Sequence, residues 1–412
     1  MSGSSDVLAT LRERGFVQQV SDEAALRTHL AQGPVTFYAG FDPTAPSLHI
    51  GSMVPLMAMA HLANHGHRPI AVLGGGTAMV GDPSGKSEMR QLLSHELIQE
   101  NRQQIEPQVR RFLAAAGDRA LVVDNAEWLL RLNYIDFLRD VGRHFSVNHM
   151  LAAEAYKIRL EKGLSFIEFN YQILQAYDFF ELNRRHGCSL QIGGDDQWGN
   201  ILAGKELIRR IEQRESYALT FPLITTAGGA KMGKTAAGAV WLSAERTSAF
   251  DFYQYFVNVD DRDVARFLKL FTFLPLEEIA RLGALEGAEI RAGKQALAYE
   301  ATRIVHGDEA AGVAERAARS AFGGGAPGED VPTHAVSAAD LASGSKVVDL
   351  LAASGLAASK SVARRLVAQG GVRVGDRRIE SLDDVIRPEE IATDGTLLHA
   401  GKKHVRRLVV KG

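Results

Sequence analysis

The 412-residue sequence contains a single cysteine, Cys188. One thiol cannot form an internal disulfide, and it cannot supply the paired cysteines of a metal site, so we expect no bound metal. The first residues lack a basic segment followed by an apolar one, and we expect no secretory signal peptide. No apolar run in the sequence is long enough to cross a bilayer. These absences predict a cytoplasmic protein with no membrane partner.

The chain also lacks a strong excess of either charge, with 47 Lys and Arg against 49 Asp and Glu. The charge is unevenly distributed, however. Residues 346–411 contain 13 Lys and Arg and 8 Asp and Glu, which gives this segment a charge of +5. Because the whole chain has a net charge of −2, the remaining residues together have a net charge of −7. A basic end on an otherwise acidic chain is typical of a segment that meets a polyanion, although a solvated surface tail gives the same count.

The first half of the chain alternates between strand-like and helix-like segments. Residues 35–40 and 69–74 have the pattern of buried strands, and after Gly51 apolar residues recur at spacings of three and four. Strand, helix, strand implies a parallel sheet with a right-handed crossover. A further strand and turn at residues 189–194 extends the pattern. We therefore predict a doubly wound, Rossmann-like α/β domain over residues 1–245, with ligands at the carboxyl ends of its strands.

The rest of the chain predicts two smaller domains. Strand patterns disappear between residues 246 and 321, where apolar residues recur at helical spacing, which predicts an all-helical domain. Residues 322–345 are rich in Ala, Gly, Pro and Ser and predict a mobile linker. Residues 346–412 combine two short helical patterns with a hairpin pattern at residues 372–379, which predicts a small α+β domain.

Two loop motifs indicate a phosphate-handling chemistry. The loop after the first strand contains His49, Gly51 and Ser52 at a predicted helix start. Helix N-termini present free N–H groups to phosphates, and a histidine there can donate to a phosphate oxygen. The second motif, at residues 231–235, places two lysines three positions apart among glycines, as in a loop that closes over a polyphosphate. The first motif alone is equally typical of an ordinary loop with a structural histidine, and the second alone is more typical of a solvated surface loop.

A third pattern lies on one predicted helix. Tyr171, Gln175 and Asp178 are spaced four and three apart, so they share one face of that helix. The other residues of this face are mostly apolar, and a buried carboxylate requires a partner. The partner is either another group of the protein or a bound ligand, and the spacing leaves both open.

Together the motifs resemble those of the class I aminoacyl-tRNA synthetases. The family patterns HIGH and KMSKS stand here as His49-Ile50-Gly51-Ser52 and Lys231-Met232-Gly233-Lys234-Thr235. Further strings resemble the bacterial tyrosyl-tRNA synthetases along almost the whole chain, at residues 38–44, 81–86, 144–148, 168–178, 190–194 and 238–242. The sequence departs from the family pattern at Ser52, Gly233, Thr235 and Asp195, the last of which is usually serine.

The resemblance implies an enzyme that activates tyrosine with ATP and transfers it to the 3′ end of tRNA(Tyr). It further implies a homodimer with no tightly bound cofactor, which takes ATP as its Mg²⁺ complex. The residues that it assigns to tyrosine are Tyr38, Asp82, Tyr171, Gln175, Asp178, Gln191 and Gln197. The residues that it assigns to ATP are Gly40, Asp42, Thr44, His49, Gly51, Ser52, Gly194, Asp196 and Lys234. The residues that it assigns to the chemical step, around the departing pyrophosphate, are His49, Lys86, Arg90, Lys231, Lys234 and Thr235.

The C-terminal segment resembles the S4-type RNA-binding module, and the helical domain would then bind the anticodon. Clustered cations on a small fold suit a phosphate backbone. The RNA-binding residues so implied are Lys360, Arg364, Arg365, Arg373, Arg377 and Arg378.

In the expected ATP site, Asp195 adds a carboxylate beside the ribose. This group would either face solvent or weaken the binding of ATP.

Three other functions share some of these features. The tryptophanyl enzyme has the same fold and signatures, but the pairing of Tyr38 with Asp178 and an S4-like tail argue against it. A nucleotidylyltransferase that does not act on tRNA would not need the helical domain and the basic tail. An RNA-binding relative without activity would account for Ser52 and Asp195, but not for the two lysines of the second motif.

Overall fold

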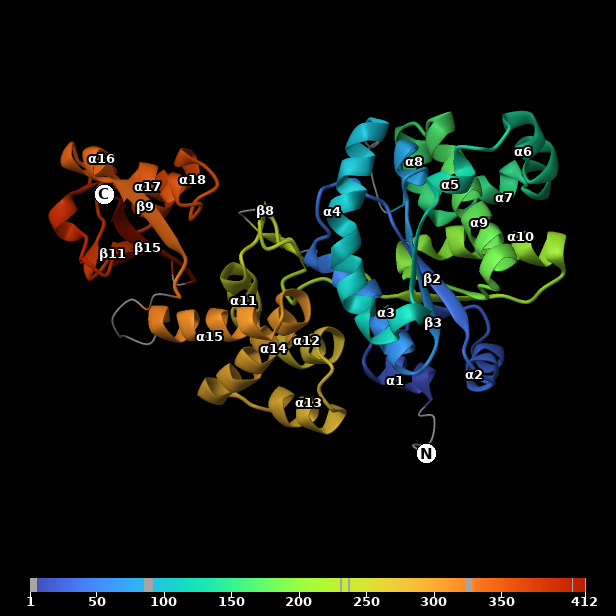
Figure 1. Cartoon of the computed structure of the whole chain (residues 1–412), viewed down its shortest axis with the longest axis horizontal. Helices are drawn as coiled ribbons and strands as arrows, with labels where there is room; N and C mark the ends of the chain where they lie inside the picture. Colours follow the sequence, from blue (N-terminus) through green and yellow to red (C-terminus); the bar gives the residue numbers. More distant parts are fainter. Residues whose placement is uncertain are drawn as a thin grey trace. The chain divides into compact units, whose positions relative to one another are not determined.

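The computed structural model describes residues 6–84, 92–229, 232–235, 238–322, 328, 330–401 and 403–411. The chain divides into two compact units, Met1–Thr225 and Thr226–Gly412. The first unit contains an α/β sheet domain, and the second contains a group of helices followed by a small α+β domain (Figure 1).

A six-stranded sheet forms the centre of the first unit, with the strand order β1-β6-β5-β2-β3-β4. Strands β2 to β6 are parallel, and only the edge strand β1 is antiparallel to its neighbour β6. The bounds are β1 Gln19–Val20, β2 Thr36–Phe41, β3 Arg68–Leu73, β4 Leu121–Asp124, β5 Leu190–Gly194 and β6 Tyr217–Phe221. The chain proceeds from β2 to β3 and β4 on one side and returns through β5 and β6 on the other. The order therefore reverses between β2 and β5, which is where such sheets bind ligands.

Four long helices cover this sheet: α3 Met53–Asn64, α4 His95–Leu113, α9 Phe166–His186 and α10 Trp198–Glu212. In Figure 1, α3 and α4 lie on one side of β2 and β3, and α9 and α10 lie on the other. Helix α9 begins with a capping box between Ser165 and Glu168 and ends at Gly187, whose φ of 62° is left-handed. A Cβ at Gly204 of α10 would lie 2.9 Å from Cβ of Phe179, so this glycine permits α9 and α10 to pack closely.

Shorter helices complete the first unit. Helices α1 and α2 lead into β2, whereas α5 to α8 connect β4 to α9. Their bounds are α1 Val7–Glu13, α2 Glu23–Ala31, α5 Ala126–Leu129, α6 Tyr134–Asp140, α7 Val147–Leu151 and α8 Glu154–Lys162. Tight 3₁₀ turns η1 Ile50–Ser52, η2 Thr77–Met79 and η5 Asp195–Gln197 follow β2, β3 and β5 in the chain. The doubly wound, Rossmann-like architecture predicted from the sequence is confirmed.

The second unit opens with a two-stranded ribbon, β7 Lys234–Thr235 and β8 Gly238–Ala239, and continues as helices. The helices are α11 Ala249–Val257, α12 Val264–Phe271, α13 Leu276–Gly283, α14 Ile290–His306 and α15 Asp308–Phe322. Phe252 and Phe256 of α11 and Phe267 and Phe271 of α12 are fully buried, so aromatic packing forms this helical core.

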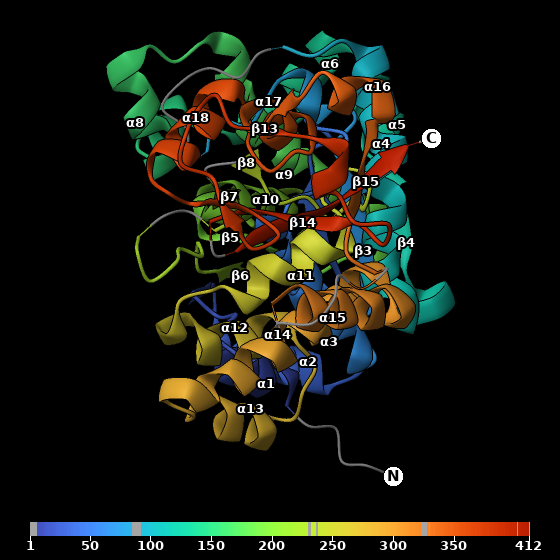
Figure 2. The same ribbon diagram turned by 90° about the vertical axis from the view of Figure 1, so that its left-hand side faces the viewer.

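The small C-terminal domain combines a five-stranded sheet, in the order β12-β11-β14-β15-β9, with the helices α17 and α18. Apolar side chains of both helices share one buried cluster with residues of this sheet. The ribbons in Figures 1 and 2 show the two helices next to the strands of this domain. The bounds are β9 Thr333–Ser337, α16 Ala338–Ala342, β10 Ser345–Lys346, α17 Val347–Ala353, α18 Lys360–Ala368, β11 Val372–Val374, β12 Arg377–Arg378, β13 Val385–Ile386, β14 Thr396–Ala400 and β15 His404–Lys411.

The structure differs from the sequence prediction in the segment that was expected to be a linker, residues 322–345. Part of it, β9, pairs in parallel with β15 and belongs to the C-terminal sheet, and α16 follows directly. Val331, Val336 and Leu341 are buried, so these apolar residues order a segment whose small-residue composition suggested mobility. Over the described part of the chain, none of the helices has the length and apolar character needed to cross a membrane.

Candidate active site

Two neighbouring residues at the reversal point of the sheet have buried polar atoms. Tyr38 of β2 is opposite Gln191 of β5 in the parallel register. The side chains are 1% and 2% exposed, and within the described structure neither the Tyr38 hydroxyl nor Gln191 Oε1 has a hydrogen-bond partner. Buried polar groups are normally paired, because an unpaired one costs free energy. Both of these residues were predicted to bind tyrosine, and they present groups that a polar ligand could satisfy.

Asp178 of α9 belongs to the same buried region, where its neighbour Phe179 packs against the Tyr38 ring. Its Oδ1 accepts from Nε1 of Trp128 at 2.7 Å, and its Oδ2 accepts from Nδ2 of Asn125 at 2.9 Å. Burial raises the pKa of Asp178 to about 7, although both of these hydrogen bonds act in the opposite direction. Burial, followed by the nearby Asp178 charge, also raises the pKa of Tyr38. The carboxyl is therefore poised between its charged and neutral forms near pH 7.

Asn125 and Trp128 are functional candidates that the sequence analysis missed. Both lie directly after β4, at the carboxyl edge of the sheet. A polar residue directly after the short apolar run at residues 121–123, with one of only three tryptophans in the chain three positions later, was the available signal. The strand itself, Leu-Val-Val-Asp, is short and was not recognised, so its end could not be located.

Asn125 also connects Asp178 to the predicted ATP-binding residue Asp42. Its Nδ2 donates to Thr77 Oγ1 at 2.9 Å, and Thr77 Oγ1 donates to Asp42 Oδ1 at 2.8 Å. The other oxygen of Asp42, Oδ2, accepts from the hydroxyl of Tyr171 at 2.9 Å. A Cβ at Gly74 would lie 1.9 Å from Asp42 Oδ1, so only glycine leaves space for this carboxylate. Tyr171, which was predicted to hold the ammonium group of tyrosine, is thus tied to Asp42.

A second polar group contains the remaining predicted tyrosine-binding residues. Asp82 accepts from the Ser84 N–H at 2.8 Å and from Gln197 Nε2 at 2.7 Å. Burial raises the pKa of Asp82, against the effect of its hydrogen bond from Ser84. Asn200 Nδ2 lies 3.1 Å from both Gln197 Oε1 and Gln175 Oε1. The structure therefore brings Asp82, Gln175 and Gln197 together, with Asn200 between them, which the sequence analysis did not include.

The His49 motif lies at the start of α3, as predicted. His49 caps η1, where its Nδ1 accepts from the Gly51 N–H at 3.0 Å. In the neutral imidazole this arrangement leaves the proton on Nε2, which can donate to a phosphate oxygen. His49 is exposed, whereas Ser52 and Thr44 are half-buried. Gly40 is exposed at the end of β2.

The turn after β5 carries the predicted ribose residues. A Cβ at Gly194 would lie 2.6 Å from Oδ1 of Asp196, so the glycine allows this carboxylate to fold back against the strand end. The unusual Asp195 has partners within the protein: its Oδ1 accepts from Gln19 Nε2 at 2.7 Å and from Thr220 Oγ1 at 2.9 Å.

Several predicted phosphate-binding residues cannot be placed. Lys86, Arg90 and Lys231 lie outside the described residues. The backbone of Lys234 and Thr235 forms β7, which pairs with β8. Among the residues that the structure does describe, no group of three or more His, Cys, Asp or Glu side chains is arranged to hold a metal ion.

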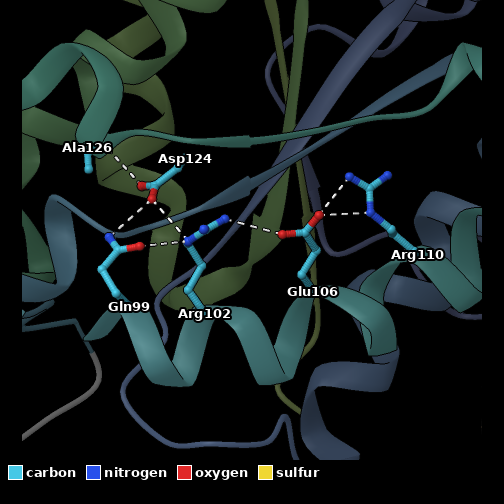
Figure 3. Close-up of polar contacts among 6 residues, drawn as sticks. All are labelled: Gln99, Arg102, Glu106, Arg110, Asp124 and Ala126. Carbon is cyan, nitrogen blue, oxygen red and sulfur yellow. Dashed lines mark hydrogen bonds and ion pairs between the residues drawn. The ribbon is translucent and has the colours of Figure 1, made fainter. Parts of the chain in front are cut away.

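A network of charged residues on α4 supports the β4 end of the site (Figure 3). Asp124, the last residue of β4, accepts from the Ala126 N–H at 2.9 Å and so caps the turn that carries Asn125 and Trp128. Arg102 Nε lies 3.3 Å from Asp124 Oδ2 and 2.9 Å from Gln99 Oε1. Arg102 also pairs with Glu106, which in turn binds Arg110.

The predicted RNA-binding cations lie on α18 and on the β11–β12 hairpin. Arg364, Arg365, Arg373 and Arg378 are exposed. Arg373 lies directly opposite Arg378 in the antiparallel register. Lys360 and Arg377 already form ion pairs, with Asp349 and Glu390 respectively.

Comparison with known proteins agrees with this geometry. A model of the family described as tRNA synthetases class I (W and Y) matches residues 30–323. A second model, the tyrosine–tRNA ligase SYY-like C-terminal domain, matches residues 326–407. A tyrosine–tRNA ligase of Clostridium botulinum is 52% identical over 407 residues, which cover 99% of this chain and 100% of the relative. A tyrosine–tRNA ligase of Desulfosudis oleivorans is 52% identical over 428 residues, covering 98% and 99%.

Solved structures show the same relationship. A C-terminally truncated mitochondrial tyrosyl-tRNA synthetase of Aspergillus nidulans has a TM-score of 0.70 at 31% identity, covering 77% of this chain and 94% of that one. A tryptophanyl-tRNA synthetase of Encephalitozoon cuniculi has a TM-score of 0.56 at 12% identity, covering 77% and 92%, and shares the fold alone.

The fold and the match of residues 30–323 to the class I family model show that the chain is a class I aminoacyl-tRNA synthetase. Within that class the chain belongs to the tyrosine–tRNA ligase family. The family, the ligase activity and the amino acid predicted from the sequence are thereby confirmed.

Proposed function

We propose that the site between β2 and β5 forms tyrosyl adenylate from tyrosine and ATP, with the substrate phenol between Tyr38 and Asp178. The observation that carries this proposal is the buried, unpartnered hydroxyl of Tyr38, whose ring packs against Phe179, the neighbour of Asp178 in α9. Trp128, which donates to Asp178, belongs to the same apolar cluster as Tyr38. A phenolic hydroxyl can both donate and accept, so it would satisfy both groups. Phenylalanine would leave the buried Tyr38 hydroxyl unpaired, a penalty that makes tyrosyl-tRNA synthetases a standard example of this kind of selection.

The other end of tyrosine would lie at the polar group around Asp82. A buried carboxylate beside Gln175 and Gln197 suits an ammonium group, because the charge offsets the desolvation of both partners. An ammonium ion here would also lower the raised pKa of Asp82 toward its ordinary value. Tyr171, through Asp42, would then connect the amino-acid end to the nucleotide end.

ATP would bind along the edge of the sheet that carries Asp42, Gly194 and Asp196. The tyrosine carboxylate attacks the α-phosphorus in line, the bond to the bridging oxygen breaks, and pyrophosphate leaves. This step needs positioning and charge neutralisation rather than a protein nucleophile. His49 Nε2 would donate to the phosphates, and the lysines of residues 231–235 would surround the leaving group. Mg²⁺ would arrive with ATP and neutralise part of the phosphate charge.

The C-terminal domain would bind the tRNA backbone. Like charges directly opposite each other on two strands are destabilising, and Arg373 and Arg378 are so placed. A phosphate between them would remove that repulsion and release counterions. Arg364 and Arg365 add two exposed cations on α18. The helical domain would contact the anticodon, and charging would take place in the cytoplasm.

We also propose that the enzyme is a homodimer, formed through the segment from α5 to the start of α9. Among the described residues of this segment, Leu130, Tyr134, Ile135, Val147 and Phe166 are large apolar side chains that are each more than half exposed. Such a concentration of exposed apolar residues marks an interaction surface, and a second copy of the chain would cover it.

The experiment that tests the proposed function is ATP–pyrophosphate exchange with each of the twenty amino acids, without tRNA. Exchange with tyrosine alone is the expected result. Exchange with tryptophan in place of tyrosine would contradict the Tyr38–Asp178 pocket but preserve the reaction. Folded protein that exchanges with no amino acid would contradict adenylate formation itself.

A further inference from the structure

Asp195 is held by two elements at the edge of the sheet. Its Oδ1 accepts one hydrogen bond from Gln19 of β1 and one from Thr220 of β6, at 2.7 Å and 2.9 Å. Gln19 and Thr220 are directly opposite each other in the antiparallel β1–β6 pair, so their side chains reach the same oxygen. Thr220 is fully buried, and Gln19 and Asp195 are half-buried.

Asp195 lies in the turn that also contains two proposed substrate-binding residues. Asp195 is the first residue of η5, and the next two residues are Asp196 and Gln197. Gln197 is fixed at the far side of the turn, where it donates to Asp82 and accepts from Asn200. The turn is therefore held at both ends, by the sheet edge at Asp195 and by the tyrosine site at Gln197. Asp196, the proposed ribose ligand, lies between these two attachments.

We propose that Asp195 is a positioning residue for the ATP subsite, acting through Gln19 and Thr220. Its carboxylate accepts hydrogen bonds from Gln19 and Thr220, and these bonds fix the turn that contains Asp196. Through Gln19, the N-terminal strand β1 therefore helps to position the nucleotide site. The inference rests on the proposed placement of the ribose at Asp196. The direction of the effect follows from this role: through its two hydrogen bonds the Asp195 side chain supports ATP binding and does not oppose it.

An opposite role for Asp195 makes an opposite prediction. A carboxylate that faced the ribose and repelled the phosphates would weaken ATP binding, so its removal would lower the KM for ATP. A carboxylate that holds the turn would raise the KM for ATP when removed. An asparagine at this position separates the two, because its amide oxygen can still accept both hydrogen bonds while the charge is lost.

The test uses the full-length enzyme and the variants Asp195→Ala, Asp195→Asn, Gln19→Ala and the double variant Asp195→Ala with Gln19→Ala. Gln18→Ala is the matched control, since Gln18 is the exposed neighbour of Gln19. Pyrophosphate exchange gives the KM for ATP, the KM for tyrosine and kcat, and thermal unfolding reports any general loss of stability. Wild-type exchange with tyrosine must first be present, and its absence would contradict the proposed function and not this inference.

We expect Asp195→Ala to raise the KM for ATP about five- to tenfold, the effect of losing about one net hydrogen bond, with an unchanged KM for tyrosine. Asp195→Asn and Gln18→Ala should stay within about twofold of wild type. Gln19→Ala should raise the KM for ATP less than Asp195→Ala does, and the double variant should show no further loss, because both residues act through one contact. A lower KM for ATP in Asp195→Ala and Asp195→Asn would overturn the inference. So would a lower melting temperature with no change in the KM for ATP.

Discussion

Trp128 Nε1 donates a 2.7 Å hydrogen bond to Oδ1 of Asp178, although the two residues are 50 positions apart in the chain. This contact joins the short helix after β4 to the middle of α9, at the point where the substrate phenol is proposed to bind. With Asn125 on the other oxygen, Asp178 has a partner on each side. Its carboxyl group is thus oriented before any ligand arrives.

Replacement of Trp128 by phenylalanine tests the importance of that orientation. Trp128→Phe keeps an aromatic ring in the core but removes the N–H donor, so one Asp178 oxygen loses its protein partner. We expect the KM for tyrosine in pyrophosphate exchange to rise about tenfold, with little change in the KM for ATP. Trp241→Phe in the second unit is the control and should match wild type. An unchanged KM for tyrosine in Trp128→Phe would show that Asn125 alone orients the carboxylate.

The raised pKa of Asp178 makes the stability of the enzyme depend on pH. The unfolded carboxyl titrates near 3.8, whereas in the folded protein its pKa is about 7. Between these values the folded state binds more protons, so this group lowers stability as the pH rises toward 7. Asp178→Asn removes the charge and keeps the shape. We expect its melting temperature, relative to wild type, to rise by a few degrees from pH 5 to pH 8. A constant difference across this range would mean that Asp178 is not titrating there.

The network on α4 extends the support of the tyrosine site to the surface of the molecule (Figure 3). Arg102 binds Asp124, which caps the turn that carries Asn125 and Trp128, whereas Arg110 on the same helix binds only Glu106 within this network. We expect Arg102→Gln to raise the KM for tyrosine about threefold, with kcat changed less. Arg110→Gln is the matched control, because Arg110 is connected to Asp124 only through Glu106 and Arg102 in this network, and this variant should match wild type. Equal effects of the two substitutions would indicate a general destabilisation of α4.

Much of the fold and a few of the proposed site residues could be predicted from local patterns in the sequence, whereas most of the site residues came from the resemblance to the synthetase family. The β2 strand is an apolar run, the Gly51 loop precedes an apolar helix, and Tyr171, Gln175 and Asp178 have helical spacing. Asn125 and Trp128 were missed because their role depends on a contact with α9, which no local pattern reports. The same holds for Gln19, whose side chain reaches Asp195 only because β1 and β6 pair.

The β9 strand illustrates a different limit of the sequence. Its five residues lie in a small-residue segment, and their order comes from parallel pairing with β15, more than 70 positions later in the chain. Asp195 could be recognised as unusual from the resemblance, because the family usually has serine there, but its partners could not be predicted. Long-range pairing decided both outcomes, whereas composition alone favoured a mobile linker and the sequence left the role of Asp195 open.

Exposed apolar residues predict the subunit interface. Ile135 is 67% exposed on α6, close in sequence to Tyr134 and Leu138, which are also exposed. Ile135→Glu would place a charge in the buried centre of a dimer, so we expect dissociation to monomers in analytical ultracentrifugation at micromolar concentration. Leu382→Glu in the C-terminal domain changes another exposed apolar residue, 44% exposed, and should leave the dimer intact. A wild-type protein that sediments as a monomer would contradict the proposed homodimer directly.

The opposed arginines of the C-terminal hairpin give the last prediction. Truncation after α15 would be a poor test of RNA binding, because Ala317 and Ala321 of that helix pack with Val331 and Val405 in one apolar cluster. The double variant Arg373→Gln with Arg378→Gln keeps this packing and removes two exposed charges that repel each other. We expect no loss of protein stability, unchanged pyrophosphate exchange, and at least about tenfold weaker tRNA charging at low tRNA concentration.

The salt dependence of tRNA binding identifies the cause of that loss. If each arginine neutralises one phosphate, the slope of log K against log salt should fall by roughly two units in the double variant. Lys346→Ala is the control, since Lys346 is already paired with Asp383 and has little charge to offer RNA. Charging that stays at the wild-type level in the double variant, with the same salt slope, would show that the hairpin does not contact the RNA. In that case the exposed arginines of α18 would have to supply the contact alone, and the mutual repulsion of Arg373 and Arg378 would have no ligand to relieve it.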